Sequence, residues 1–216
     1  MTLRVSDAGV RLTVPARVPA ARIDAFLRAS APWVEQQRAL LPAGAVPLAA
    51  GDRLAHLDDD LTLVLRDDGA RAVERRGDRL LAPADRLDAR VEAWFRVQAL
   101  AIAGERARRL ADGLGVQVAG VSVRDPRTRW GSCSASARLT FSWRLLLAPE
   151  PVLDYVVAHE VCHLLRPDHS PAFWALLAEV APGHEPGRAW LRRHGTVLHR
   201  GPAWRAHAGQ EGLSPA

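Results

Sequence analysis

The stretch that most constrains this chain is residues 156–165, which read VVAHEVCHLL. It contains His159 and His163, four residues apart, with Glu160 directly after the first histidine. On an α-helix, positions i and i+4 lie on one face, so both imidazoles can reach one metal ion. Glu160 points about 100° away, where its carboxylate can act on a metal-activated water without binding the metal itself. The pattern therefore predicts a site for zinc-dependent hydrolysis with Glu160 as general base.

A third zinc ligand is expected just after this helix. Pro151 favours a helix start, and Pro167 prevents the helix from continuing past Arg166. The chain must therefore turn sharply before His169, which follows His159 by ten residues. Such a turn can bring a third imidazole back to the metal. We accordingly expect His169 to complete the ligand set.

Two other residues stay open as ligands because spacing alone does not decide between them. Glu179 follows His163 by sixteen residues on the next expected helix, and a downstream helical glutamate is the thermolysin-type solution. His184 lies beside a Pro-Gly turn and can serve instead to stabilise a developing oxyanion. The ten-residue histidine spacing also matches the metzincins, but their methionine turn is excluded because Met1 is the only methionine.

Composition indicates a globular protein in a reducing compartment. The 216 residues carry a net charge of +5 and include only two cysteines, so no disulfide framework is implied. No apolar run approaches the roughly 20 residues needed to span a bilayer, so a cytoplasmic location and no membrane partner are expected. All basic residues are arginines and no run of five occurs, so a nucleic-acid partner is only weakly supported.

The expected organisation has three parts. Residues 1–82 form a β-rich unit with one helix, residues 83–200 form the metallopeptidase domain, and residues 201–216 form a flexible tail. The first unit opens with a hairpin over residues 3–14, turning at residues 7–9, and a helix over residues 20–41 that Pro32 is expected to split.

Further along, a linker is expected at residues 41–47 and a long helix over residues 83–114. Gly131 is expected in a loop or bulge at a demanding backbone position. A strand follows over residues 138–145, as a candidate edge for a peptide substrate. The last helix is expected to stop at Gly195.

Two residues near the histidine helix each have two interpretations. Tyr155 lies one turn before His159 and can touch the site, although a core position with one hydrogen bond is the simpler expectation. Cys133 can be a redox-sensitive or inhibitory thiolate near the zinc, or an ordinary free cysteine.

Several short motifs surround the histidine helix: RWGSC at 129–133, WRL at 143–145, DYVVAHEVCHL at 154–164, DHS at 168–170 and FW at 173–174. Together they resemble the YgjP-like zinc metallopeptidases, which are related to the WLM and SprT-like proteases. The resemblance is strong over residues 120–195 and extends weakly to the N-terminal hairpin and helix. It departs at Ser142, where the family is expected to carry asparagine, which puts a substrate contact at that position in doubt.

This resemblance implies an α+β fold: a zincin-like core, with a small sheet and an active-site helix, behind an N-terminal hairpin and helix. It implies one Zn²⁺ per chain on His159, His163 and His169, with Glu160 as general base. The expected function is hydrolysis of a peptide or protein substrate through a zinc-activated water. The alternative is a zinc-stabilised binding module or a DNA-associated protein-processing protein of the SprT or WLM kind. The oligomeric state is left open.

Overall fold

The computed structural model describes residues 1–6, 9–15, 17–39, 47–126 and 128–200. The expected hairpin turn at residues 7–8, nearly all of the expected linker and the expected tail at 201–216 lie outside the described residues. The chain divides into two compact units, one before residue 47 and one over residues 47–199. The division expected from the sequence lay at residue 82 instead.

The first unit contains a hairpin and one helix. Strands β1 (Thr2–Ser6) and β2 (Gly9–Thr13) pair antiparallel, and α1 spans Ala20–Ala39. The prediction that Pro32 splits this helix is wrong, because α1 runs through it without a break. The ring of proline fixes φ at a helical value, so the helical backbone can continue through Pro32, although its missing N–H removes one hydrogen bond.

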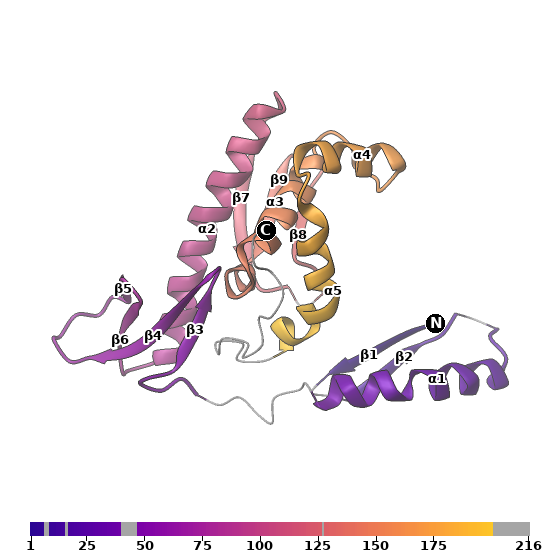
Figure 1. Ribbon diagram of the computed structural model, residues 1–216, viewed down its shortest axis with the longest axis horizontal. Coiled ribbons are helices and arrows are strands. Elements are labelled where there is room, and N and C mark those ends of the chain that lie inside the picture. Colours follow the sequence, from indigo (N-terminus) through magenta and orange to yellow (C-terminus); the bar gives the residue numbers. More distant parts are fainter. Residues whose placement is uncertain (7–8, 16, 40–46, 127, 201–216) are drawn as a thin grey trace. The chain divides into compact units, whose positions relative to one another are not determined.

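The second unit begins with a four-stranded sheet (Figure 1). Its strands lie in the order β3-β4-β6-β5, with β4 and β6 parallel and the other pairs antiparallel. The strands are β3 (Arg53–His56), β4 (Asp59–Arg66), β5 (Glu74–Arg76) and β6 (Arg79–Pro83). The apolar side chains of this sheet and those of the following helix belong to one core: Leu54, Leu61, Leu63, Leu80, Val91 and Phe95. The strands up to Pro83 therefore fold onto the helix that follows them.

The long helix α2 (Leu87–Gly113) is the central support of the second unit. Its buried face carries small side chains at helical spacing: Ala99, Ala103, Gly104, Ala107 and Ala111. Small side chains allow the neighbouring backbones to approach closely, and α2 contacts α3 and β7 along its length.

The second sheet has three strands, in the order β7-β9-β8. They are β7 (Gly120–Arg124), β8 (Gly131–Cys133) and β9 (Arg138–Ser142), and β8 pairs antiparallel with β9 while its other side forms the edge of the sheet. The expectation that Gly131 lies in a loop is wrong, because this glycine opens the edge strand.

A 3-10 turn, η1 (Trp143–Leu147), leads from this sheet to three helices, α3 (Glu150–Cys162), α4 (Pro171–Val180) and α5 (His184–Arg200). The prediction that the last helix stops at Gly195 is wrong, because α5 continues past it. A Cβ at this position would lie 3.2 Å from the Trp130 indole, so the glycine serves close packing rather than termination. The α+β class expected from the sequence is confirmed, with a small sheet beside α3 that is consistent with a zincin-like core.

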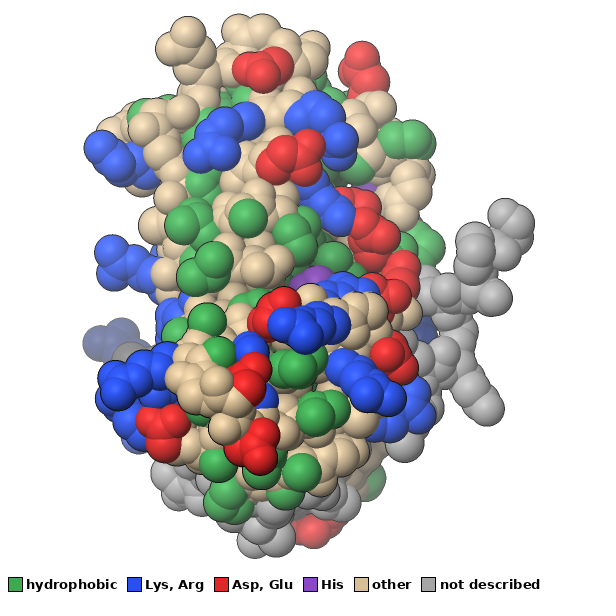
Figure 2. Space-filling model, turned by 90° about the vertical axis from the view of Figure 1, so that its left-hand side faces the viewer, with side chains coloured by type: hydrophobic (Ala, Val, Ile, Leu, Met, Phe, Trp, Pro, Cys, Tyr) green, Lys and Arg blue, Asp and Glu red, His purple; other side chains and the backbone are tan. Residues whose placement is uncertain are grey.

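Surface charges of both signs are interspersed on the face shown in Figure 2. Several arginines of the second unit are neutralised by nearby carboxylates: Arg66 by Asp68 at 2.5 Å, Arg76 by Glu74 at 2.8 Å and Arg144 by Asp125 at 2.7 Å. Among the described residues, no helix has both the length and the apolar character needed to cross a membrane.

The close packing on the small-residue face of α2 can be tested by introducing a larger side chain there. Ala103 is 1% exposed, so an Ala103→Leu substitution should lower the free energy of unfolding by about 1–3 kcal/mol, because the neighbouring elements must move apart. Ala101→Leu is the matched control, because Ala101 is exposed on the same helix. Equal urea-unfolding midpoints for the two variants would contradict this packing.

Candidate metal centre

Helix α3 presents the first two histidines as its sequence predicts. Pro151 occupies its first turn, where a missing backbone N–H costs nothing. After Cys162 the chain tightens into one more turn, in which the backbone N–H of Arg166 donates to the Cys162 carbonyl at 2.9 Å. Pro167 then ends the helical geometry. The turn directs the following segment back toward the face of α3 that carries His159.

The three histidines meet at their Nε2 atoms. The Nε2 of His159 lies 3.2 Å from that of His163 and 3.1 Å from that of His169. The three ligand atoms all lie within 4.8 Å of one another. Nitrogens about 2.0–2.1 Å from a tetrahedral ion stand about 3.3 Å apart, so the donor set fits one small divalent cation.

Contacts behind the imidazoles hold two of the three rings. Nδ1 of His163 lies 2.9 Å from the carbonyl oxygen of Arg166, which can only accept, so Nδ1 carries the proton and Nε2 keeps its lone pair. The indole N–H of Trp174 donates to the carbonyl of His169 at 3.1 Å and holds that turn in place. Phe173 packs against all three rings, at centroid separations of 4.6–4.9 Å.

His159 is kept neutral by its surroundings. Burial, together with the charges that His163 and His169 carry when protonated, lowers the pKa of His159 to about 4. A neutral imidazole offers a lone pair to a metal, whereas an imidazolium cannot. Its Nδ1 is buried and has no hydrogen-bond partner within the described parts of the chain, so the ring is positioned by packing.

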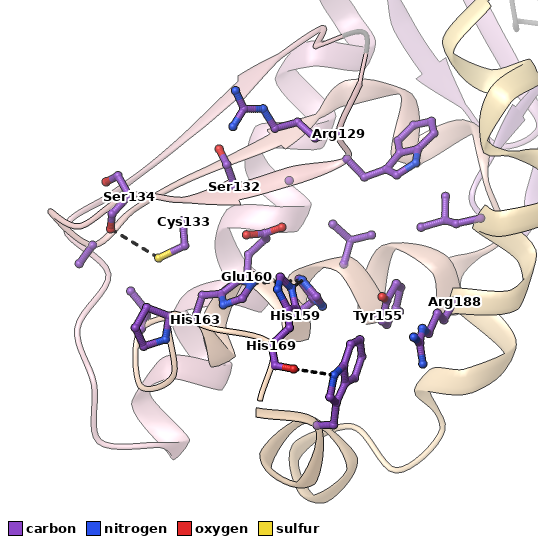
Figure 3. Close-up of a pocket in the computed structure, with 18 of the residues that line it drawn as sticks. Arg129, Ser132, Cys133, Ser134, Tyr155, His159, Glu160, His163, His169 and Arg188 are labelled. Carbon is purple, nitrogen blue, oxygen red and sulfur yellow. Dashed lines mark hydrogen bonds between the residues drawn. The ribbon is translucent and has the colours of Figure 1, made fainter. Parts of the chain in front are cut away.

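Glu160 lies beside the imidazoles and under strand β8, as Figure 3 shows. It is only 6% exposed, and burial raises its pKa to about 7 while the nearby Arg129 opposes that rise. A Cβ at Gly131 would lie 2.6 Å from the Glu160 side chain, so any residue larger than glycine would clash with Glu160 in its present position. A carboxylate with a pKa near neutrality can both accept and return a proton.

These groups share one cavity of about 1060 Å³. Its walls come from β8 and the segments on either side of it, from α3, from the turn after it, and from α4 and α5. Helix α5 reaches the cavity because Gly187 packs directly on the start of α3. A Cβ there would lie 2.4 Å from the carbonyl oxygen of Pro151 and 3.1 Å from Cβ of Tyr155.

The two alternative ligands lie apart from the imidazole group. Glu179 lines a different cavity, of about 480 Å³, between α2, α3 and α4. His184 is engaged elsewhere, with Nδ1 at 2.9 Å from the carbonyl of Ala181 and Nε2 at 3.2 Å from Glu185. Of the candidates left open by spacing, the fold brings His169 to His159.

The remaining residues singled out in the sequence have distinct surroundings. Cys133 lines the cavity, and both burial and the charge of Glu160 raise the pKa of its thiol. Tyr155 also lines it, with its ring 5.8 Å from that of His159, and burial raises the pKa of its phenol. Ser142 is buried, and its hydroxyl accepts the backbone N–H of Arg144 to cap η1 at 3.3 Å.

Some contributors to the site were not apparent from the sequence. Gly131 and Gly187 act through contacts with residues far away in the chain, and Trp174 acts through a hydrogen bond to the carbonyl of His169, five residues before it. The FW pair at 173–174 contributed to the family resemblance without indicating a specific contact, and nothing local distinguishes Gly187 from a turn glycine. Their roles depend on which elements pack together.

Comparison with known proteins identifies similar chains. A family model described as "YgjP-like, metallopeptidase domain" matches residues 1–194, which confirms the resemblance seen in the sequence and includes the N-terminal hairpin and helix. Among solved structures, the chain is similar to the metallopeptidase zymogen abylysin of Pyrococcus abyssi, with 26% identity and a TM-score of 0.39, covering 46% of this chain and 97% of that one. No curated protein matched the chain.

The seating of α5 on α3 can be tested at its closest contact. Gly187→Ala should lower the free energy of unfolding by about 1–3 kcal/mol, because the new methyl group meets the backbone of Pro151. Gly183→Ala is the control, because a Cβ at Gly183 meets nothing within 4 Å. Denaturant unfolding followed by tryptophan fluorescence measures both, and a Gly187→Ala variant as stable as the control would contradict the packing.

Proposed function

We propose that this chain, which belongs to the YgjP-like metallopeptidase family, hydrolyses peptide bonds with Glu160 as general base and one Zn²⁺ on His159, His163 and His169. The observation that carries the proposal is the convergence of three imidazole nitrogens beside a buried carboxylate in one cavity. A metallopeptidase acts on peptide or protein substrates, and we extend that class to this chain. A cytoplasmic location stays a prediction.

The metal is proposed to be zinc because of the donor set. Three imidazoles that leave one position open are a common arrangement in catalytic zinc sites. When bound there, Zn²⁺ would act as a Lewis acid and lower the pKa of a water molecule to about 7. His159 is suited to its role because its lowered pKa keeps the ring neutral at physiological pH.

Glu160 is proposed to move the proton. Its carboxylate takes a proton from the attacking water and later gives it to the leaving amine. Burial supports both steps, because a pKa of about 7 balances proton uptake against proton release at neutral pH. Arg129 limits how far burial raises that pKa, so the carboxylate is not locked in its protonated form.

Strand β8 is proposed to align the substrate. It is an edge strand, and its free side can pair with an extended peptide through backbone hydrogen bonds. Gly131, Ser132 and Cys133 line the cavity from this strand, and Gly131 lies directly over Glu160. A peptide added along β8 would therefore pass across the carboxylate and the imidazoles. The sequence had pointed to the strand at 138–145 for this role, but β9 is the central strand and has no free edge.

A DNA-associated role has less support. The arginines described above in ion pairs are partly neutralised, and acidic side chains interrupt the basic ones on the face in Figure 2. A nucleic-acid interface usually gathers its basic residues into a stripe or groove.

Replacing the general base tests the mechanism. Glu160→Gln keeps the size of the side chain but cannot accept the proton, so kcat for peptide cleavage should fall by about 100- to 10,000-fold. Zinc content, measured by elemental mass spectrometry, should stay at the wild-type level. A variant that cleaves peptide at the wild-type rate would exclude Glu160 as the base.

Metal content tests the ligand set. Wild-type protein should hold about one zinc per chain, and His169→Ala should lose most of it, because removing one of three ligands weakens a site that has only three. Glu179→Ala is the matched control, since its side chain lies at the other cavity. Retention of zinc by His169→Ala and its loss in Glu179→Ala would reverse the assignment.

A further inference from the structure

The cavity that holds the proposed reaction centre is lined by an unusual set of charges. Three arginines reach it, Arg129, Arg188 and Arg192, whereas Glu160 is the only carboxylate among its lining residues. In Figure 3, Arg129 lies on the β8 side of Glu160 and Arg188 on the α5 side. The cavity therefore carries excess positive charge around the place where a substrate would sit.

Two of these arginines have no hydrogen-bond or ion-pair partner among the residues that the structure describes. Arg106, by contrast, is paired with both Glu150 and Asp154. Within the described residues, neither Arg129 nor Arg192 makes a hydrogen bond or an ion pair. Unpaired guanidinium groups beside a cavity retain all their N–H donors for a ligand.

Arg188 and Arg192 form a pair on α5. They are four residues apart, so their side chains lie on one face of the helix, and both line the cavity. The guanidinium of Arg188 stacks on the Trp174 indole, 4.2 Å from the ring centroid. It also lies 3.4 Å from Glu185, whose side chain is 67% exposed and lies outside the cavity lining.

The contact with Trp174 holds the Arg188 guanidinium at the cavity, where it can donate hydrogen bonds to a ligand. A guanidinium that lies over an aromatic ring can still donate its N–H groups to a carboxylate. Tyr155, Trp174 and Leu191 form the adjoining apolar wall of the same cavity. The combined surface matches a group with a short aliphatic stem and an anionic end.

We propose that Arg188 and Arg192 form a subsite for a carboxylate of the substrate, supplied by an acidic residue close to the bond that is cleaved. This inference rests on the proposed peptidase function and adds a substrate class to it. Arg129 is left out of the subsite because it lies on the other side and acts on Glu160. A carboxylate at the end of the peptide chain has the same chemistry, and the experiment distinguishes the two sources.

The test compares four matched peptides as substrates of the zinc-loaded protein. Three of the peptides have an amidated C-terminus and carry Glu, Gln or Lys at one position beside the scissile bond. The fourth carries Gln at that position and has a free C-terminus. The Glu peptide should have a kcat/KM about tenfold or more above the Gln peptide, since a charge-assisted hydrogen bond is lost in the latter. If the Gln peptide with a free C-terminus reaches the kcat/KM of the Glu peptide, the carboxylate at the chain end is the one recognised.

Charge reversal on α5 assigns the preference to the subsite. Arg192→Glu should abolish the preference for the Glu peptide and raise kcat/KM for the Lys peptide. Arg193→Glu is the matched control, because Arg193 is exposed on the same helix, is not among the lining residues, and changes the net charge equally. Arg188→Gln should weaken the preference without reversing it.

The outcomes separate this inference from the proposed function. Equal cleavage of all four peptides, with Arg192→Glu behaving like Arg193→Glu, overturns the subsite and leaves the peptidase standing. If the wild-type protein cleaves none of the peptides, the proposed function fails. The subsite is then tested by binding alone: fluorescence anisotropy measures the affinity of labelled peptides for the zinc-loaded Glu160→Gln variant. Tighter binding of the Glu peptide than of the Gln peptide, lost in an added Arg192→Glu substitution, supports it. Equal binding overturns it.

Discussion

Two imidazoles on successive turns of α3 can meet only while the helix stays regular, and a third can join them only if the chain reverses immediately afterwards. Both conditions are met here, because α3 runs to Cys162 and one tight turn follows before Pro167. The Nε2 atom of His159 lies 3.1–3.2 Å from those of the other two histidines, and burial keeps the pKa of His159 low, so that this ring stays neutral. The rest of the second unit serves to hold this arrangement.

The support comes from two sides of α3. Behind it, the small residues of α2 allow close packing, and α3 contributes Val152, Val156 and Val157 to the shared core. In front of it, Gly131 brings β8 against Glu160, and Gly187 brings α5 against Pro151. Two glycines thus determine how closely the walls of the cavity approach the active-site helix. A Cβ at either position would displace a neighbour, since protein interiors have little free space.

The cavity has more basic than acidic side chains in its lining. Glu160 is buried and is the only carboxylate among the lining residues, so the fixed charges facing a substrate are mainly those of arginines on β8's flank and on α5. A group of like charges is unfavourable for the folded protein unless a ligand neutralises it. In the first sheet of the second unit, by contrast, Arg66 is paired with Asp68 and Arg76 with Glu74. Arg129 and Arg192 have no such partner among the described residues, so their guanidinium groups remain available to a ligand.

The sequence by itself determined the histidine helix, its proline boundaries and the return of His169, because each depends on residues within ten positions of one another. The motifs around that helix also indicated the family. Only the tertiary structure showed that His169, and not Glu179, lies beside His159 and His163, that α1 is continuous through Pro32 and that α5 runs past Gly195. It also placed β8 at the edge, and Arg188 and Arg192 beside the cavity. These outcomes depend on contacts between distant segments, and local propensity and spacing carry no information about which faces will meet.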